Sequence, residues 1–247
     1  MIAEPGSEAQ IITGCAVHPN IHGGLHVGIS EFYIKEDAKL TFTMIHAWNR
    51  NFDSRPRSAA LIGDNATFVS NYLLFQPVKN LQMYPVAYCK GVNSRVEFNN
   101  IIYGSGDSHI DVGSKVILQN SGARGEIITR AIATDNAKIY ARGLLQGEHE
   151  ESRAHLECRG LLLSDRAMIY TIPELLAKAQ GAELSHEAAV GKIAEEEIYY
   201  LMARGFSEKE AASLIVRGFM DISIFGLPKD LEENIKRIVK ATAERAL

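Results

Sequence analysis

A short motif returns along this 247-residue chain at a fixed spacing. It consists of Asp or Asn, a small residue, a polar residue and then alternating apolar positions. The copies of a first set begin at equal steps, at Asp37, Asn65 and Asn93. The copies of a second set lie about half a period out of phase and begin at Asp107, Asn136 and, more loosely, Asp165. A constant period of this length indicates one small structural unit repeated along the chain.

The alternation inside each motif predicts β-strands with one buried face. The Asp/Asn-small pair before each strand is typical of turns, since these side chains bond the local backbone and tolerate unusual dihedral angles. Strands about fourteen residues apart leave no room for helices between them, which leaves an antiparallel sandwich or a solenoid. A sandwich gives no reason for a constant period, whereas stacked coils must match in length. We therefore predict a mainly β fold, a parallel β-helix over residues 1–192 with about 28 residues and two strands per coil.

The pattern changes after Lys192, where apolar residues begin to recur at helical spacing. Ser207 and Glu210 have the spacing of a capping box, in which each residue bonds the other's backbone at a helix start. An apolar stripe follows that box, and a third helical stretch lies nearer the C-terminus. We therefore expect a small helical C-terminal domain over residues 193–247.

The composition limits the partners of the chain. It has 26 Lys and Arg against 30 Asp and Glu, a net charge of −4, and nucleic-acid binding calls for a basic face. No apolar run approaches the ~20 residues of a membrane span, and the first residues lack the regions of a signal peptide. We expect a cytoplasmic protein that binds neither nucleic acid nor membranes. Its three cysteines are odd in number and widely spaced, which predicts free thiols.

Cys158 stands one period of the motif before His186, which Glu187 follows. If the period holds, these residues lie on adjacent coils, where strand backbones are ~4.8 Å apart. A thiolate, an imidazole and a carboxylate form a mixed ligand set suited to iron or zinc. Consecutive strand residues point to opposite faces, however, so His186 and Glu187 face Cys158 together only if the strand is bulged or ends there. The alternative is that Cys158 is a small buried apolar residue.

Other residues of metal-binding type carry weaker signals. Three histidines, at positions 18, 22 and 26, follow one another at four-residue steps, but Pro19 and Gly23-Gly24 disfavour a helix there, so we interpret them as loop histidines. Cys15 and Cys89 lack ligand-like neighbours at diagnostic spacing and are interpreted as ordinary thiols. His46 shares a strand face with Trp48, and we expect both to be core or lining residues.

Five further sequence motifs resemble the C-terminal signature of the SufB/SufD family of iron–sulfur cluster assembly proteins. They lie at Leu162–Asp165, Thr171–Leu175, Ser185–Ile193, Tyr200–Gly205 and Val216–Phe219. The resemblance implies a right-handed parallel β-helix followed by a helical domain, in agreement with the period. It also implies a scaffold on which iron and sulfide are assembled, which is not itself an enzyme and acts with a separate ATPase, SufC, bound to the helical domain.

The same resemblance implies roles for individual residues. The SufB positions for a cluster-ligating cysteine and glutamate are Cys158 and Glu187 here, and the SufD-type histidine is His186. Because one chain holds all three, we expect a homodimer in which it serves both roles, with a SufB–SufD-like heterodimer as the alternative. The cofactor implied is a transient iron–sulfur cluster. A flavin occurs in some complexes of the family, but no motif in this sequence supports one.

Two other functions remain open at this point. A solenoid carbohydrate-active enzyme would need a dense set of carboxylates on one strand register and a secretory route, and the sequence shows neither. A structural interaction module would leave Cys158 inert.

Overall fold

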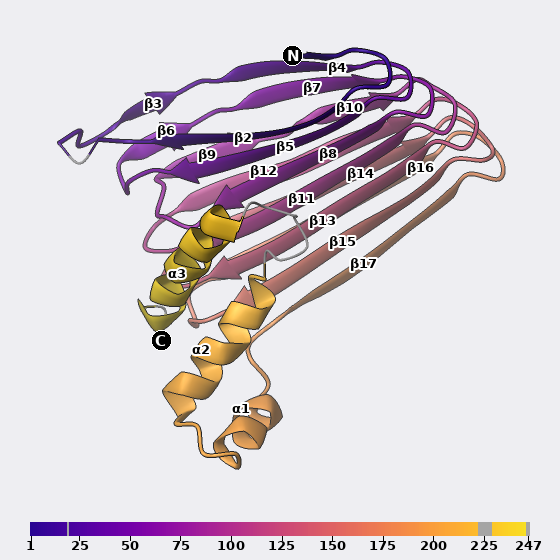
Figure 1. Ribbon diagram of the computed structural model, residues 1–247. Helices are drawn as coiled ribbons and strands as arrows, with labels where there is room; N and C mark the ends of the chain where they lie inside the picture. The colour runs from indigo at the N-terminus through magenta and orange to yellow at the C-terminus, as the bar shows by residue number, and fades with distance from the viewer. Residues whose placement is uncertain (19, 222–228, 246–247) are drawn as a thin grey trace.

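The computed structural model of the chain describes residues 1–18, 20–221 and 229–245. Its strands form a parallel β-solenoid of about 7 turns with about 29 residues per coil, and helices follow at the C-terminal end (Figure 1). The mainly β fold and the parallel β-helix predicted from the repeat are confirmed. The helices begin after the last strand, at Glu195, while the division into two domains at residues 192 and 193 stays a prediction.

One wall of the solenoid is a seven-stranded parallel sheet, with one strand from each coil in sequence order. Its strands are β2 (Glu8–Ala16), β5 (Lys39–Ala47), β8 (Thr67–Leu74), β11 (Arg95–Gly104), β13 (Arg124–Ala133), β15 (Arg153–Leu162) and β17 (Glu183–Gly191).

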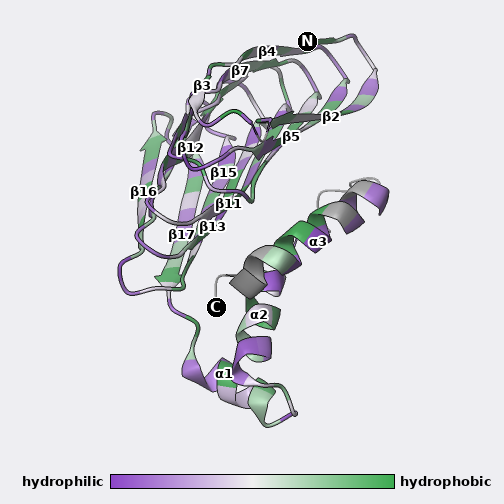
Figure 2. Ribbon diagram, turned by 90° about the vertical axis from the view of Figure 1, so that its left-hand side faces the viewer, coloured by the Kyte–Doolittle hydropathy of each residue, from purple (hydrophilic) through white to green (hydrophobic). Residues whose placement is uncertain are grey.

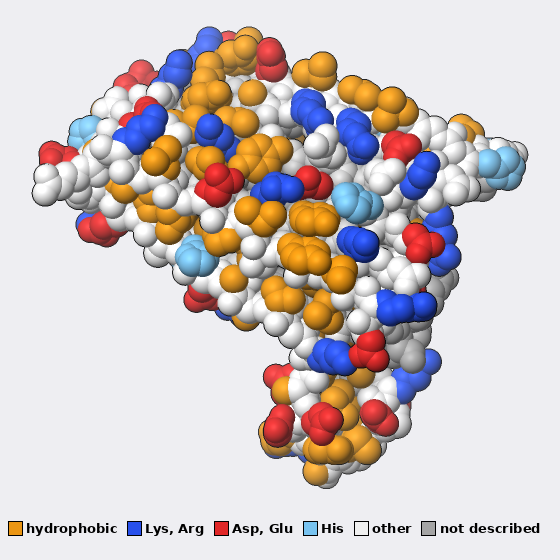
Figure 3. Space-filling view, turned by 180° about the vertical axis from the view of Figure 1, so that it is seen from behind, with side chains coloured by type: hydrophobic (Ala, Val, Ile, Leu, Met, Phe, Trp, Pro, Cys, Tyr) orange, Lys and Arg blue, Asp and Glu red, His pale blue; other side chains and the backbone are white. Residues whose placement is uncertain are grey.

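The other wall is a ten-stranded sheet, in which the early coils contribute two short strands each and the later coils one long strand. Its short strands are β1 (Ile2–Ala3), β3 (Gly24–His26), β4 (Ile29–Ile34), β6 (Phe52–Ser54), β7 (Arg57–Ile62), β9 (Asn80–Met83) and β10 (Val86–Cys89). The long ones are β12 (His109–Leu118), β14 (Lys138–Gly147) and β16 (Met168–Ala177). Figure 3 shows the molecule from behind, where hydrophobic side chains gather with charged ones among them.

The turns between coils have the chemistry that the motif predicts. Asp37, Asn65 and Asn93 adopt positive φ angles of 56°, 53° and 55°, which Asp and Asn tolerate better than most residues. The small residue after each of them is buried, as Ala38 and Ala66 illustrate at 1% and 0% exposure. The first set of motif copies therefore marks a left-handed turn residue followed by a small buried residue just before the next strand. In the second set the positive φ falls one residue earlier, at Gly106 and Asp135.

The inner faces of the two sheets enclose the core. Phenylalanine rings from the two walls pack against one another inside it, with ring centroids 4.8 Å apart for Phe32 and Phe42 and 4.9 Å apart for Phe32 and Phe68. A buried asparagine ladder also links coils, because the Nδ2 of Asn99 donates to Asn71 at 3.0 Å and the Nδ2 of Asn71 donates to Thr43 at 3.1 Å. Apolar packing thus joins the two walls, and side-chain hydrogen bonds link β5, β8 and β11 in register.

The helices are α1 (Glu195–Met202), α2 (Glu208–Phe219) and α3 (Lys229–Arg245). Ser207 and Glu210 form the predicted capping box at the start of α2. Val216 of α2 and Ile235 of α3 are buried in one apolar cluster with Ile101 of β11, so these helices cover part of the seven-stranded sheet (Figure 2). Within the described ranges, we find no helix with the length and apolar character needed to cross a bilayer.

Candidate functional site

Cys158 lies on β15, which is the next-to-last strand of the seven-stranded sheet, and its side chain points into the core. It is 2% exposed, belongs to the same apolar cluster as Leu156, and pairs with Ala188 on β17. Burial, with a smaller contribution from the Glu157 carboxylate, raises the pKa of the Cys158 thiol to about 11. In this arrangement the side chain is a protonated thiol at neutral pH.

His186 lies on β17, the last strand of the sheet. It pairs with Leu156, two residues before Cys158 on the neighbouring strand. Because side chains two residues apart on a strand share a face, the register places His186 and Cys158 on the same inner face of the sheet. The imidazole is exposed nonetheless, since no further strand of the described chain stacks on β17.

Glu187 projects to the opposite, outer face, where it pairs with Glu157. Both carboxylates bind one guanidinium, because Arg159 contacts Glu157 at 2.8 Å through Nε and Glu187 at 3.3 Å through Nη2. The structure therefore brings Cys158 and His186 to one face and holds Glu187 away from them.

The expectation that Cys158 and His186 occupy equivalent positions on adjacent coils is wrong, and the cause is a change in coil length. The numbers of paired residues differ by 28 between β5 and β8 and between β8 and β11. They differ by 29 between β11 and β13 and between β13 and β15, and by 30 between β15 and β17. A period measured on the early coils thus places the partner of Cys158 at His186, when the true partner stands two residues further along β17. The facing constraint derived from strand alternation does hold, since Glu187 points outward.

Cys158 also ends a column of buried polar residues. In the paired registers, Tyr72, Asn100, Thr129 and Cys158 follow one another on four successive strands. The Nδ2 of Asn100 donates to Thr129 Oγ1 at 3.3 Å, and both residues are at most 3% exposed. The thiol therefore adjoins a polar track inside the core.

A second group of metal-capable side chains is present where the spacing of the motif predicts none. Cys15, His26 and His46 offer ligand atoms that all lie within 4.8 Å of one another. Among the described residues, Cys158 belongs to no such group. His26 lies on β3 and not in a loop, and Cys15 pairs with His46 across β2 and β5. The step between Cys15 and His46 is longer than the period of the motif, so a search at that period misses this pair.

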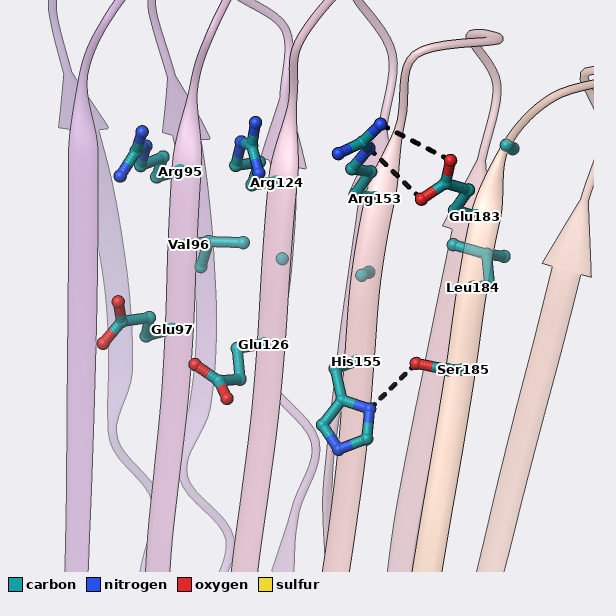
Figure 4. Close-up of a pocket in the computed structure, with 13 residues that line it drawn as sticks. Arg95, Val96, Glu97, Arg124, Glu126, Arg153, His155, Glu183, Leu184 and Ser185 are labelled. Atoms are coloured by element: carbon teal, nitrogen blue, oxygen red, sulfur yellow. Dashed lines mark hydrogen bonds and ion pairs between the residues drawn. The ribbon is translucent and has the colours of Figure 1, made fainter.

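The outer surface of the seven-stranded sheet is hollowed over β11, β13, β15 and the start of β17 (Figure 4), with a volume of about 700 Å³. Arg95, Arg124 and Arg153 form a column along it, and Glu97 and Glu126 line its other side. Burial, and then repulsion from Glu97, raises the pKa of Glu126. Because carboxylates accompany the arginines, this hollow carries no large excess of either charge.

Comparison with known proteins places this architecture. A family model described as "SUF system FeS cluster assembly, SufBD core domain" matches residues 1–219, which include the whole solenoid together with α1 and α2. The chain belongs to the SufBD family, as its C-terminal motifs indicate.

Named relatives agree with that assignment. The chain is 53% identical over 239 residues to an iron–sulfur cluster assembly SufBD family protein of Methanothermobacter thermautotrophicus strain Winter, covering 97% of this chain and 58% of the relative. It is 50% identical over 247 residues to a SufBD family protein of Archaeoglobus fulgidus, covering 100% of this chain and 66% of the relative. It is 26% identical over 250 residues to iron–sulfur cluster assembly protein SufB of Bacillus subtilis, covering 100% of this chain and 53% of the relative. The chain thus spans between about half and two thirds of these relatives.

Proposed function

We propose that this chain is a scaffold on which iron and sulfide are assembled into a cluster, with Cys158, His186 and Glu187 as ligands. The single observation that carries the proposal is the position of Cys158 and His186 on one inner face at the end of the solenoid. Within the described chain, β16 and β17 are the last strands of their sheets, and no further strand pairs with the free edge of either. The ligand set therefore adjoins an open end of the β-stack, where a second subunit has backbone and side chains to meet.

Access to Cys158 requires a movement at this end. The thiol is covered by β17 through the Cys158–Ala188 pair, and the thiolate is the form that binds iron. Displacement of β17 exposes the sulfur, lowers its pKa and frees Glu187 from Arg159. The last strand is also the segment that leads into α1 four residues after its end, so a force on the helices acts directly on β17.

The open last coil and the family membership support a proposal for two partners. We propose that a SufC-type ATPase binds the C-terminal helices and drives the displacement of β17, and that two copies of this chain meet through their last coils as a cytoplasmic homodimer. A second copy brings another set of the three ligands to the interface. Nitrogen and oxygen donors hold a cluster less firmly than four thiolates, which suits a scaffold that releases its product.

Anaerobic reconstitution of the purified full chain with iron and sulfide, together with the ATPase and ATP, tests the proposal. Wild type is expected to develop the visible absorption of a cluster, whereas Cys158→Ser loses most of it. Cys89→Ser is the matched control, because Cys89 is also a buried core thiol, at 0% exposure, on the opposite sheet. Equal cluster loading of wild type and Cys158→Ser would contradict the role of Cys158 and favour a structural module with an inert cysteine.

The other two ligands are tested in the same assay. His186→Ala and Glu187→Gln are each expected to lower cluster yield while leaving the melting temperature almost unchanged, because both side chains are exposed. Glu187→Gln keeps the shape of the side chain and removes its charge. A yield equal to wild type in both variants would leave Cys158 as the sole supported ligand and refute the mixed set.

A further inference from the structure

We infer that Cys15, His26 and His46 form a binding site for a divalent transition-metal ion of the zinc or ferrous type, separate from the cluster-assembly site. The three side chains come from β2, β3 and β5, in the first two coils of the solenoid. Their ligand atoms lie within 4.8 Å of one another. Figure 1 shows these strands at the opposite end of the stack from β15 and β17.

The strand register explains why the side chains converge. Cys15 and His46 are directly paired on adjacent parallel strands, so their side chains project to the same side of the sheet. His46 is 1% exposed, and its ring lies 5.4 Å from that of His26, centroid to centroid. His26 reaches this point from the opposite wall, on β3. The site is therefore built across the interior of the solenoid by both sheets.

The imidazole of His46 supplies a second, independent observation. Its Nδ1 forms a hydrogen bond with the Tyr72 hydroxyl at 2.9 Å, while its Nε2 is buried without a partner. Buried polar atoms are nearly always paired, so an orphaned ring nitrogen that adjoins a thiol and a second imidazole indicates a ligand for that atom. The hydroxyl on the other ring nitrogen is the kind of outer partner that fixes the tautomer of a metal-binding histidine.

The donor set selects the class of ion. A sulfur donor and two imidazole nitrogens suit zinc or ferrous iron and disfavour magnesium and calcium, which take oxygen ligands. Zn–S and Zn–N bonds of about 2.3 and 2.1 Å place the donors of a tetrahedral site roughly 3.5 Å apart. Donors within 4.8 Å therefore close around an ion through small side-chain rotations. Binding releases the thiol proton, and three protein ligands leave one position for water or another ligand.

Aromatic rings wall the site. The Trp48 ring lies 4.8 Å from the His26 ring and 4.8 Å from the His46 ring, and it stacks on Phe52 with an interplanar angle of 4°. These contacts restrict rotation of both imidazoles and keep them close together. They also limit the access of water to His46. A bound ion would therefore remove the cost of burying Nε2 without a partner.

Titration of the tag-free full chain with Co²⁺ under reducing, anaerobic conditions tests the inference. We expect one Co²⁺ per chain at this site, with visible absorption of tetrahedral cobalt and a thiolate-to-cobalt charge-transfer band. Cys15→Ser is expected to abolish the charge-transfer band, and His26→Ala to weaken binding more than tenfold. His22→Ala is the matched control for His26→Ala, because His22 is an exposed histidine four residues away, and it is expected to bind as wild type does.

Two further variants assign the bound metal to this site and to no other thiol. Cys158→Ala is expected to keep the Co²⁺ spectrum, so loss of cluster assembly and loss of this site are distinguishable. Tyr72→Phe removes only the outer hydroxyl and is expected to weaken Co²⁺ binding about 10–100-fold without removing the charge-transfer band. Circular dichroism confirms that each variant is folded. Absence of stoichiometric binding, or a spectrum unchanged in folded Cys15→Ser, would overturn the inference.

Discussion

The three cysteine side chains differ in how far solvent reaches them. Cys15 is half-buried, while Cys89 and Cys158 are 0% and 2% exposed. Burial raises the pKa of Cys89 to about 12 and that of Cys158 to about 11. Because the thiolate is the reactive form, a thiol with a pKa near 11 is ionised in only about one molecule in a thousand at pH 8.

Alkylation therefore has an expected order. With iodoacetamide at pH 8 in the absence of metal, Cys15 is modified first, and Cys158 and Cys89 are modified only after denaturant is added. Peptide mass spectrometry over time measures the order, and Cys15→Ser removes the fast phase. Modification of Cys158 at the rate of Cys15 in the folded chain would show that β17 already stands away from β15.

At this scale the sequence predicts the turns better than the sites. The positive φ angles of Asp37, Asn65 and Asn93 follow from the tolerance of Asp and Asn for left-handed backbone conformations, which is a property of the residue type. The Cys15–His26–His46 group depends on the longer first coil and on contact across the interior, and neither is visible in a period measured elsewhere. The period assigns Cys158 and His186 to neighbouring strands, as the structure does, but the extra residues of the last coil shift their pairing.

At the scale of elements, close stacking of turns limits which residues fit. Gly91 lies in the turn before β11, and a Cβ built there would clash with the backbone of Gly63 and Asp64 in the turn of the preceding coil. Gly191, at the end of β17, has nothing within 4 Å of its own Cβ position.

The two glycines form a matched pair for substitution. Gly91→Ala is expected to lower the free energy of unfolding by roughly 1–3 kcal/mol, because the backbone of the adjacent turn must shift. Gly191→Ala is expected to change it by no more than about 0.5 kcal/mol. Urea denaturation of both variants measures the difference. Equal free energies of unfolding would contradict the close contact between the turns at Gly91 and Gly63.

An exposed ion pair links the turns that follow β14 and β16, the last two strands of the ten-stranded sheet. Glu148, after β14, accepts a hydrogen bond from Lys178, after β16, at 2.9 Å and another from Gln119 at 2.9 Å. Lys178, followed by Gln119, lowers the pKa of Glu148 from 4.5 to about 2. A carboxylate with a depressed pKa stabilises the fold above its unfolded pKa, and this contribution is lost as pH falls through its folded pKa.

The stability that Lys178 contributes is therefore expected to depend on acid. Lys178→Met is less stable than wild type at pH 6, and the difference shrinks as pH falls from about 4.5 to about 2. Urea denaturation at a series of pH values follows both proteins, with 0.5 M salt as a further condition because exposed pairs are screened. A difference that is independent of pH would assign the effect of Lys178 to packing of its alkyl chain.

At the scale of the whole molecule, the solenoid has an end that its own described chain leaves uncovered. Leu175 on β16 pairs with the core residue Leu145, so it projects inward, yet it is 41% exposed. Val190 on β17 is 39% exposed and pairs with Gly160. Parallel strands with open backbone edges and inward apolar side chains need a cover, because such edges otherwise pair with other chains.

The repeat itself makes this end foreseeable, since a solenoid must stop somewhere, but the sequence does not say which side chains its last coil leaves bare. That depends on the packing of α2 and α3, which cover the outer face near Ile101 and not the open end. The chain thus has a covered flank and a last coil with an open edge. The last coil is where the proposed homodimer forms and where Cys158 lies one strand from the edge.

Leu175→Glu tests that use of the end. Burial of a leucine contributes about 1.5–3 kcal/mol, and a buried unpaired carboxylate adds a cost, so we expect dimer dissociation to become more than tenfold easier. Val92→Glu is the control, because Val92 is similarly exposed at 39% but lies in a turn away from the last coil. Sedimentation velocity over a concentration series measures both. A wild type that stays monomeric at high concentration, or a Leu175→Glu variant that associates as well as Val92→Glu, would place the interface elsewhere and remove the reason for sharing ligands between subunits.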